Sequence, residues 1–197
     1  MEATYCVIDR SGSMANCLDD TIGGFNTFLA DQPKESLMSI YLFDNEVTEL
    51  ARLKKVSEIE PLNKTNYRPW GGTALLDAMG QAIKVASNCT ADTITMVFLT
   101  DGAENSSRTY TKAHVNDLIE DRKRQGWKFV FLAANQDAIQ TGATLGIPEE
   151  ASLTYGVEQT QEAFQCLSSA LERARTDGNE GVQFTKMERA SSCPAGP

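Results

Sequence analysis

Three short stretches of this sequence carry hydroxyl and carboxylate side chains at spacings that suit a small, hard cation. In the first, Asp9 is followed by hydroxyls two and four residues later, at Ser11 and Ser13, with Gly12 between them. Mg²⁺ takes about six oxygen ligands at about 2.1 Å and keeps several of its waters. Two hydroxyls and nearby carboxylates can therefore form part of its coordination shell. On its own the pattern is weak, because serine-rich loops after strands are common.

Two further loops strengthen the prediction of a metal site. Thr73 follows two flexible glycines and precedes a helical pattern, and Thr100-Asp101-Gly102 follows a strongly apolar run. Glycines let a backbone approach a ligand closely. The sequence therefore predicts a metal site whose protein ligands are Asp9, Ser11, Ser13, Thr73 and Asp101.

The same residues have a structural alternative, in which the hydroxyls cap a helix or close a turn by binding nearby N–H groups. Glu104 and Asn105, which follow Asp101, are interpreted as solvated loop residues, with tuning of the site's charge or contact with a partner as the alternative. Trp70 is either a buried anchor for its loop or an exposed aromatic binding residue. Asn135 and Gln136 are candidates for the rim of the site.

The elements that must position these loops alternate between strand and helix patterns. Apolar strand patterns occur at residues 5–8, 37–43, 47–53, 93–99, 127–133 and 152–155. Helical spacing predicts a first helix that Asp19 or Asp20 is expected to cap, and a second helix at residues 75–86. A third helix ends at Gly126, a fourth covers residues 137–145, and a final helix contains Leu167.

This alternation predicts an α/β fold with a doubly wound, mostly parallel sheet of about six strands and helices on both faces. Asp44-Asn45-Glu46 predicts a hairpin and therefore one antiparallel edge. In the common strand order 3-2-1-4-5-6 the first and fourth strands are neighbours, so Asp9 and Asp101 should converge where ligands bind such sheets.

The chain length of 197 residues suits a single domain, which we assign to residues 1–175. Residues 176–197 contain glycines, serines and prolines with few large apolar residues, which predicts a flexible tail. The composition, 41% hydrophobic and 23% charged, is that of an ordinary globular protein.

The order and separation of Asp9-x-Ser11-x-Ser13, Gly72-Thr73 and Thr100-Asp101-Gly102 resemble the metal-ion-dependent adhesion site (MIDAS) of von Willebrand factor type A (VWA) domains. The resemblance covers about residues 3–175, and all five site positions match. It implies a Rossmann-like doubly wound sheet, a Mg²⁺ or Mn²⁺ ion at the sheet's upper edge, and a partner protein whose acidic side chain completes the coordination of that ion. Arg10 adds a positive charge beside the site.

The net charge of −9 argues against nucleic acid as a partner, because phosphate binding needs clustered Lys and Arg. No apolar run is long enough to predict a membrane span, and the first strand leaves no room for a signal peptide. The 5 cysteines are scattered, without a C-x-x-C pair, which predicts free thiols. We therefore expect a stand-alone, cytoplasmic domain.

The leading functional hypothesis is a non-enzymatic, metal-dependent module that binds an acidic residue of a partner protein. A regulatory subunit of an ATPase or of a kinase and phosphatase system is an alternative that the family scaffold also allows. A Mg²⁺-dependent phosphoryl-transfer enzyme is less favoured. Phosphatases of the haloacid-dehalogenase type need a second aspartate where Ser11 stands, and the sequence has no phosphate-binding G-x-x-x-x-G-K-[ST] motif.

Overall fold

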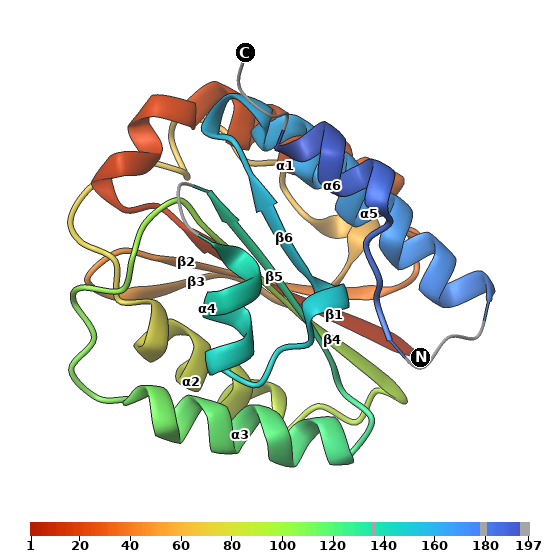
Figure 1. The fold of residues 1–197 in the computed structure, drawn as a ribbon. Helices are drawn as coiled ribbons and strands as arrows, with labels where there is room; N and C mark the ends of the chain where they lie inside the picture. Colours follow the sequence, from red (N-terminus) through yellow and green to blue (C-terminus); the bar gives the residue numbers. More distant parts are fainter. Residues whose placement is uncertain (135–136, 178–180, 194–197) are drawn as a thin grey trace.

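The computed structural model describes residues 1–134, 137–177 and 181–193. Their centre is a six-stranded sheet in the order β3-β2-β1-β4-β5-β6, as the sequence predicted (Figure 1). Only β3 among these strands runs antiparallel to its neighbour. The strands are β1 (Glu2–Asp9), β2 (Leu37–Phe43), β3 (Val47–Lys55), β4 (Thr93–Thr100), β5 (Lys128–Ala134) and β6 (Ser152–Tyr155).

Helices cover both faces of the sheet (Figure 1). One face carries α1 (Leu18–Asp31) and α5 (Thr160–Thr176), with α6 (Lys186–Ser192) beside α5 and β6. The other face carries α2 (Leu75–Ala86), α3 (Lys112–Arg124) and α4 (Ala138–Thr144). The central strands read as continuous apolar runs because alternate residues face opposite helix layers.

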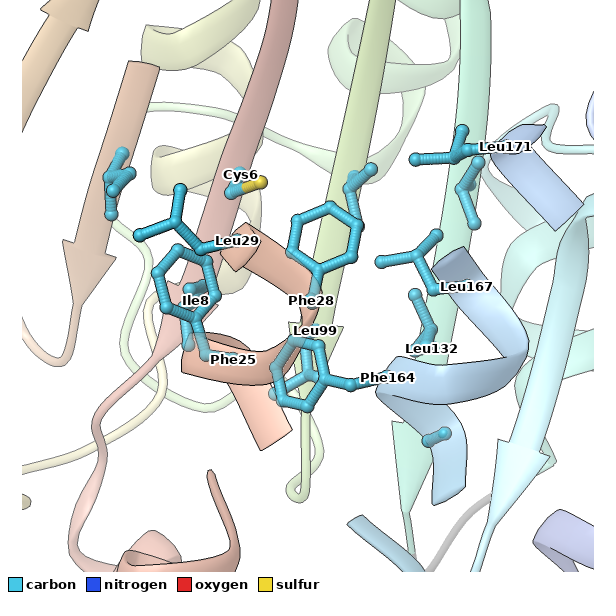
Figure 2. Close-up of a cluster of buried hydrophobic side chains, with 14 of the residues drawn as sticks. Cys6, Ile8, Phe25, Phe28, Leu29, Leu99, Leu132, Phe164, Leu167 and Leu171 are labelled. Atoms are coloured by element: carbon cyan, nitrogen blue, oxygen red, sulfur yellow. The ribbon is translucent and has the colours of Figure 1, made fainter. Parts of the chain in front are cut away.

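The core beneath α1 and α5 is built on an aromatic cluster. Phe164 lies with its ring centroid 6.0 Å from that of Phe25 and 6.1 Å from that of Phe28. Figure 2 shows the rings of Phe25 and Phe28 from α1 and of Phe164 from α5 clustered in front of Ile8 and Leu99 of the sheet. Full burial of such side chains contributes about 1.5–3 kcal/mol each, so this layer holds α1 and α5 against β1 and β4.

The start of α1 differs from the expectation that Asp19 or Asp20 caps it. A 3₁₀ turn, Gly12–Cys17, comes first and buries Met14 and Cys17, and α1 then begins at Leu18 without a side-chain cap. The two aspartates lie inside the first turn, where their negative charge is favourable near the helix N-terminus. The chain therefore leaves the first loop as a tight turn that is buried on one side.

Part of the segment 176–197, which the sequence predicted to be a flexible tail, is ordered against the domain in the described residues 181–193. Helix α5 runs to Thr176, Val182 and Phe184 are buried against the domain, and α6 follows. Thr185 and Glu188 form a capping box at the start of α6, and Arg173 binds both carboxylate oxygens of Glu188, at 2.8 and 2.7 Å. The Thr-x-x-Glu pattern is a capping-box signal for this helix, although the segment is polar overall.

The C-terminal segment also covers the outer edge of β6. The N–H of Phe184 donates to the carbonyl of Glu150, and the Arg189 guanidinium donates to the carbonyl of Ser152 at 2.7 Å. Exposed strand edges are prone to pairing with other chains, so this cover protects the sheet. Within the described ranges, no helix has both the length and the apolar character needed to cross a membrane.

Candidate metal-binding site

Adjacent strands bring the first and third predicted loops together at the carboxyl edge of the sheet. Strand β1 pairs in parallel with β4, with Ile8 opposite Leu99, so Asp9 lies beside Thr100. The Thr100 hydroxyl donates to Asp9 Oδ2 at 2.6 Å, and the Ser11 N–H donates to Asp9 Oδ1 at 2.6 Å. The carboxylate of Asp9 is thus fixed by one donor on each oxygen.

The two serines connect this carboxylate to Asp101. The hydroxyl oxygens of Ser11 and Ser13 lie 3.2 Å apart, and the Ser13 hydroxyl donates to Asp101 Oδ1 at 2.6 Å. Ser11 is buried, whereas Ser13 is exposed in the 3₁₀ turn. The oxygen cluster therefore runs from the buried Asp9 to solvent at Ser13.

Thr73 reaches the same place from the loop before α2. A β-carbon placed on Gly102 would lie 3.3 Å from Thr73 Oγ1 and 3.6 Å from Ser13 Oγ. Both hydroxyls therefore face a space that a side chain at Gly102 would fill. The structure brings together all five residues that the sequence singled out.

This donor set fits a hard divalent cation. It consists of two carboxylates and three hydroxyls, all oxygen ligands, and two of the hydroxyls lie close to Gly102, which has no side chain. No group of three or more His, Cys, Asp or Glu suited to a metal occurs in the described part of the chain. The candidate site therefore depends on hydroxyls, which leave more positive charge on a bound ion than carboxylates do.

Burial dominates the electrostatics of the two carboxylates. The pKa of Asp9 is raised to about 6, mainly because burial removes the carboxylate from water; hydrogen bonds from Thr100 and Ser11 oppose this rise, and the charge of Asp101 adds to it. Burial likewise raises the pKa of Asp101, although the Ser13 hydrogen bond opposes this. Two partly desolvated acids side by side favour the uptake of a cation or a proton.

Arg10 does not neutralise this charge. Its guanidinium instead contacts the β2–β3 hairpin. Nε lies 2.7 Å from Asp44 Oδ2, and Nη2 donates to the Thr48 hydroxyl at 3.0 Å. The main chain of Arg10 instead links loops, since its N–H donates to the carbonyl of Phe43 and its carbonyl accepts from Trp70. The positive charge beside the site thus stabilises the β2–β3 hairpin.

Two residues that we interpreted as solvated have structural roles. Asn105 Oδ1 accepts from the Thr73 N–H at 2.9 Å, and Glu104 accepts from the N–H of Leu76 in the first turn of α2 at 2.9 Å. Glu104 also accepts from the N–H groups of Ser106 and Ser107. The loop after β4 therefore holds Thr73 in position. The sequence gives only a weak signal for this role of Glu104, because its target, the N–H of Leu76, is distant in sequence.

The rim candidates Asn135 and Gln136 lie outside the described residues.

Comparison with known proteins identifies the family. The family model of the von Willebrand factor type A domain matches residues 4–104, more than half of the chain. The comparison with curated proteins found no match. Among solved structures, the vWF domain of the pilus tip protein Mfa5 from Porphyromonas gingivalis has a TM-score of 0.69 at 12% identity, over 94% of this chain and 97% of that one.

Two other similar structures are longer proteins. The pilus adhesin SpaC of Lactobacillus rhamnosus GG has a TM-score of 0.66 at 14% identity, over 85% of this chain and 29% of that one. Proximal thread matrix protein 1 of the mussel byssus, in a form with a zinc-occupied MIDAS motif, has a TM-score of 0.63 at 14% identity, over 85% of this chain. This chain spans only 44% of the mussel protein. Its sheet order, flanking helices and family match show that the chain belongs to the von Willebrand factor type A domain family.

Proposed function

We propose that this domain is a non-enzymatic protein-binding module that depends on a divalent metal. Asp9, Ser11, Ser13, Thr73 and Asp101 would hold Mg²⁺ or Mn²⁺, directly or through water. The carrying observation is that two carboxylates with raised pKa converge with three hydroxyls in a cluster that reaches solvent at Ser13. The mussel relative with a zinc-occupied MIDAS motif supports a divalent ion in this fold.

The protein's own residues would orient the ion and leave it incompletely neutralised. Thr100 and the Ser11 N–H hold both oxygens of Asp9, and Ser13 holds Asp101, so the ligands need little rearrangement. A bound cation would supply the positive charge that attracts an acidic oxygen from outside. We propose that a partner protein provides this oxygen from an Asp or Glu side chain.

The thermal unfolding midpoint tests the metal. A ligand that binds only the folded state stabilises it by about 2.7 kcal/mol at one hundred times its Kd, which for a domain of this size raises the midpoint by about 5–10 °C. We expect this rise for the wild type in Mg²⁺ or Mn²⁺ but not in EDTA. Asp9→Ala should abolish it. Asp19→Ala, which removes an exposed carboxylate from the first turn of α1, should retain the metal-induced rise.

The unfolding midpoint in EDTA shows whether each variant folds. A wild-type midpoint that is the same in metal and EDTA would contradict the metal site. An equal response in Asp9→Ala and Asp19→Ala would show that the ion binds elsewhere.

A cytoplasmic location is a second part of the proposal, supported by the thiols. Cys6, Cys17 and Cys166 are buried as free thiols, and no disulfide forms within the described ranges. Disulfides are common in secreted proteins and rare in the cytosol. Fractionation of the source cells, with the protein detected by an antibody, tests this location directly.

A further inference from the structure

A cleft of about 540 Å³ lies next to Thr73 on the same edge of the sheet. Three loops form it, namely the β2–β3 hairpin, the segment before α2 and the segment after β4. Its lining is mostly polar, with one aromatic ring and one residue of each charge: Asn45, Glu46, Trp70, Asn105, Ser106, Ser107 and Arg108.

Two carboxamides are held over Gly72 with their oxygens inward. The N–H of Gly72 donates to Asn45 Oδ1 at 2.8 Å, and Asn105 Oδ1 accepts from Thr73 and from the Ser106 hydroxyl. A β-carbon on Gly72 would lie 2.8 and 2.9 Å from these two oxygens, so both amides approach the same point. Because the oxygens are occupied, each Nδ2 is the group left to donate, and neither has an acceptor in the described part of the chain.

Trp70 lies in the same cleft on a constrained backbone. Its side chain is 64% exposed, which excludes the buried-anchor interpretation. Its N–H donates to the carbonyl of Arg10 at 2.8 Å, and the next carbonyl, of Gly71, accepts from Gly12 at 3.1 Å. A large exposed ring on a fixed loop loses little conformational entropy when a partner covers it.

Arg108 supplies the positive charge of the cleft. Its main-chain N–H is held by Asp77 Oδ2 at 2.9 Å, which fixes where the side chain begins. Arg108 is exposed and has no ion pair within 4 Å among the described residues, although its charge helps to lower the pKa of Asp77. The cleft therefore combines unpaired N–H donors with an aromatic face, beside a site proposed to attract an acidic residue.

We propose that this cleft binds a second acidic side chain of the same partner segment, close in sequence to the one at the metal. This inference rests on the proposed function. Arg108 and the two amide Nδ2 groups would donate to the carboxylate, and Trp70 would cover the adjoining peptide. Glu46 in the same lining repels any anion, so it disfavours a phosphate more than a carboxylate, which carries less negative charge.

The test selects ligands from a random peptide library displayed on phage, using immobilised wild-type protein in Mn²⁺ with elution by EDTA. We expect the eluted peptides to share a pair of acidic residues. For a synthetic peptide of the selected sequence, changing either acid to its amide should weaken binding at least tenfold.

Charge variants assign the second acid to the cleft. Arg108→Gln should weaken binding of the two-acid peptide about tenfold. It should leave binding unchanged for the peptide whose second acid, the one proposed for the cleft, is changed to its amide. Arg68→Gln, which removes an exposed positive charge outside the cleft lining, should leave binding of both peptides unchanged. Arg108→Glu should bind a peptide with lysine at the second position better than the two-acid peptide.

The outcomes separate the two proposals. Metal-dependent peptides with one shared acid, or equal affinities for wild type and Arg108→Gln, would overturn the cleft assignment and leave the metal-dependent module intact. Failure to obtain any peptide that EDTA releases, together with an unfolding midpoint that metal does not change, would overturn both. The metal-induced rise in midpoint must persist in Arg108→Gln, since this variant should alter only the cleft.

Discussion

The phenol of Tyr67 donates a hydrogen bond of 2.5 Å to the main-chain carbonyl of Asp9, and both residues are fully buried. Tyr67 belongs to the long connection between β3 and α2 that also delivers Thr73. Burial raises the pKa of Tyr67 well above its ordinary value, so the phenol stays protonated and remains a donor. One side chain thus joins two of the three loops of the candidate site.

Tyr67→Phe should lower the free energy of unfolding by about 1–2 kcal/mol, because the Asp9 carbonyl loses a buried partner. It should also weaken Mn²⁺ binding several-fold, since the end of β1 is less well held. Urea unfolding and isothermal titration calorimetry measure these effects. Tyr41→Phe is a suitable control, because the Tyr41 phenol binds Glu49 on the hairpin away from the site. An equal loss of metal affinity in both variants would contradict a specific role for Tyr67.

The raised pKa of Asp9 predicts how stability without metal depends on pH. A carboxyl group whose folded pKa lies near 6, above its ordinary value of 3.8, favours folding most when protonated, and this contribution disappears as pH rises through 6. In EDTA at pH 7, Asp9→Asn should therefore unfold at a higher urea concentration than the wild type. Its free energy of unfolding should be higher by about 1–2 kcal/mol. At pH 4 the advantage should disappear. A wild type that remains more stable than Asp9→Asn at pH 7 would contradict this prediction.

The attachment of α6 should weaken in acid. Burial raises the pKa of Glu188, but the Arg173 guanidinium and the cap of Thr185 outweigh it, so the pKa is lowered from 4.5. The stabilisation is therefore present above about pH 4.5 and is lost as pH falls through the folded pKa. Glu188→Gln should destabilise the protein by about 1 kcal/mol at pH 7, because Arg173 is partly exposed, and by less at pH 3.

Urea titrations of wild type and Glu188→Gln at the two pH values measure this difference. Glu172→Gln, which changes a glutamate of the same helix as Arg173, serves as the matched control. A difference that is the same at both pH values would show that Glu188 acts through packing and not through its charge.

Two neighbouring glycines of α1 should respond oppositely to alanine. A β-carbon on Gly24 would lie 2.7 Å from Phe164 Cδ2 and 3.1 Å from the Cα of Gln161, so Gly24→Ala should separate α1 from α5 and cost about 1–3 kcal/mol. Gly23 has no atom within 4 Å of that position, and Gly23→Ala should stabilise the helix by up to about 1 kcal/mol. Thermal unfolding of both variants compares them directly, and a stabilised Gly24→Ala would contradict the close packing.

Sequence reasoning succeeded where the information is local and periodic. The strand patterns predicted the strands, and the common order of doubly wound sheets, which the structure has, placed Asp9 and Asp101 together at the ends of β1 and β4. The sequence did not predict contacts between residues that are distant in sequence. Glu104 holds the first turn of α2, and Val182 and Phe184 fill a surface that only the folded domain provides. No periodicity indicates either contact.

The parallel sheet also gives the molecule two different ends. The amino group of Met1 pairs with Asp92, just before β4 begins, whereas the carbonyl of Ser192 accepts from Gly156, just after β6 ends. The N-terminus therefore lies at the edge opposite the candidate site, and α6 ends near the site's edge (Figure 1). A surface-coupling tag at the N-terminus would present the site outward to a soluble binder, whereas one at the other end would turn it toward the support.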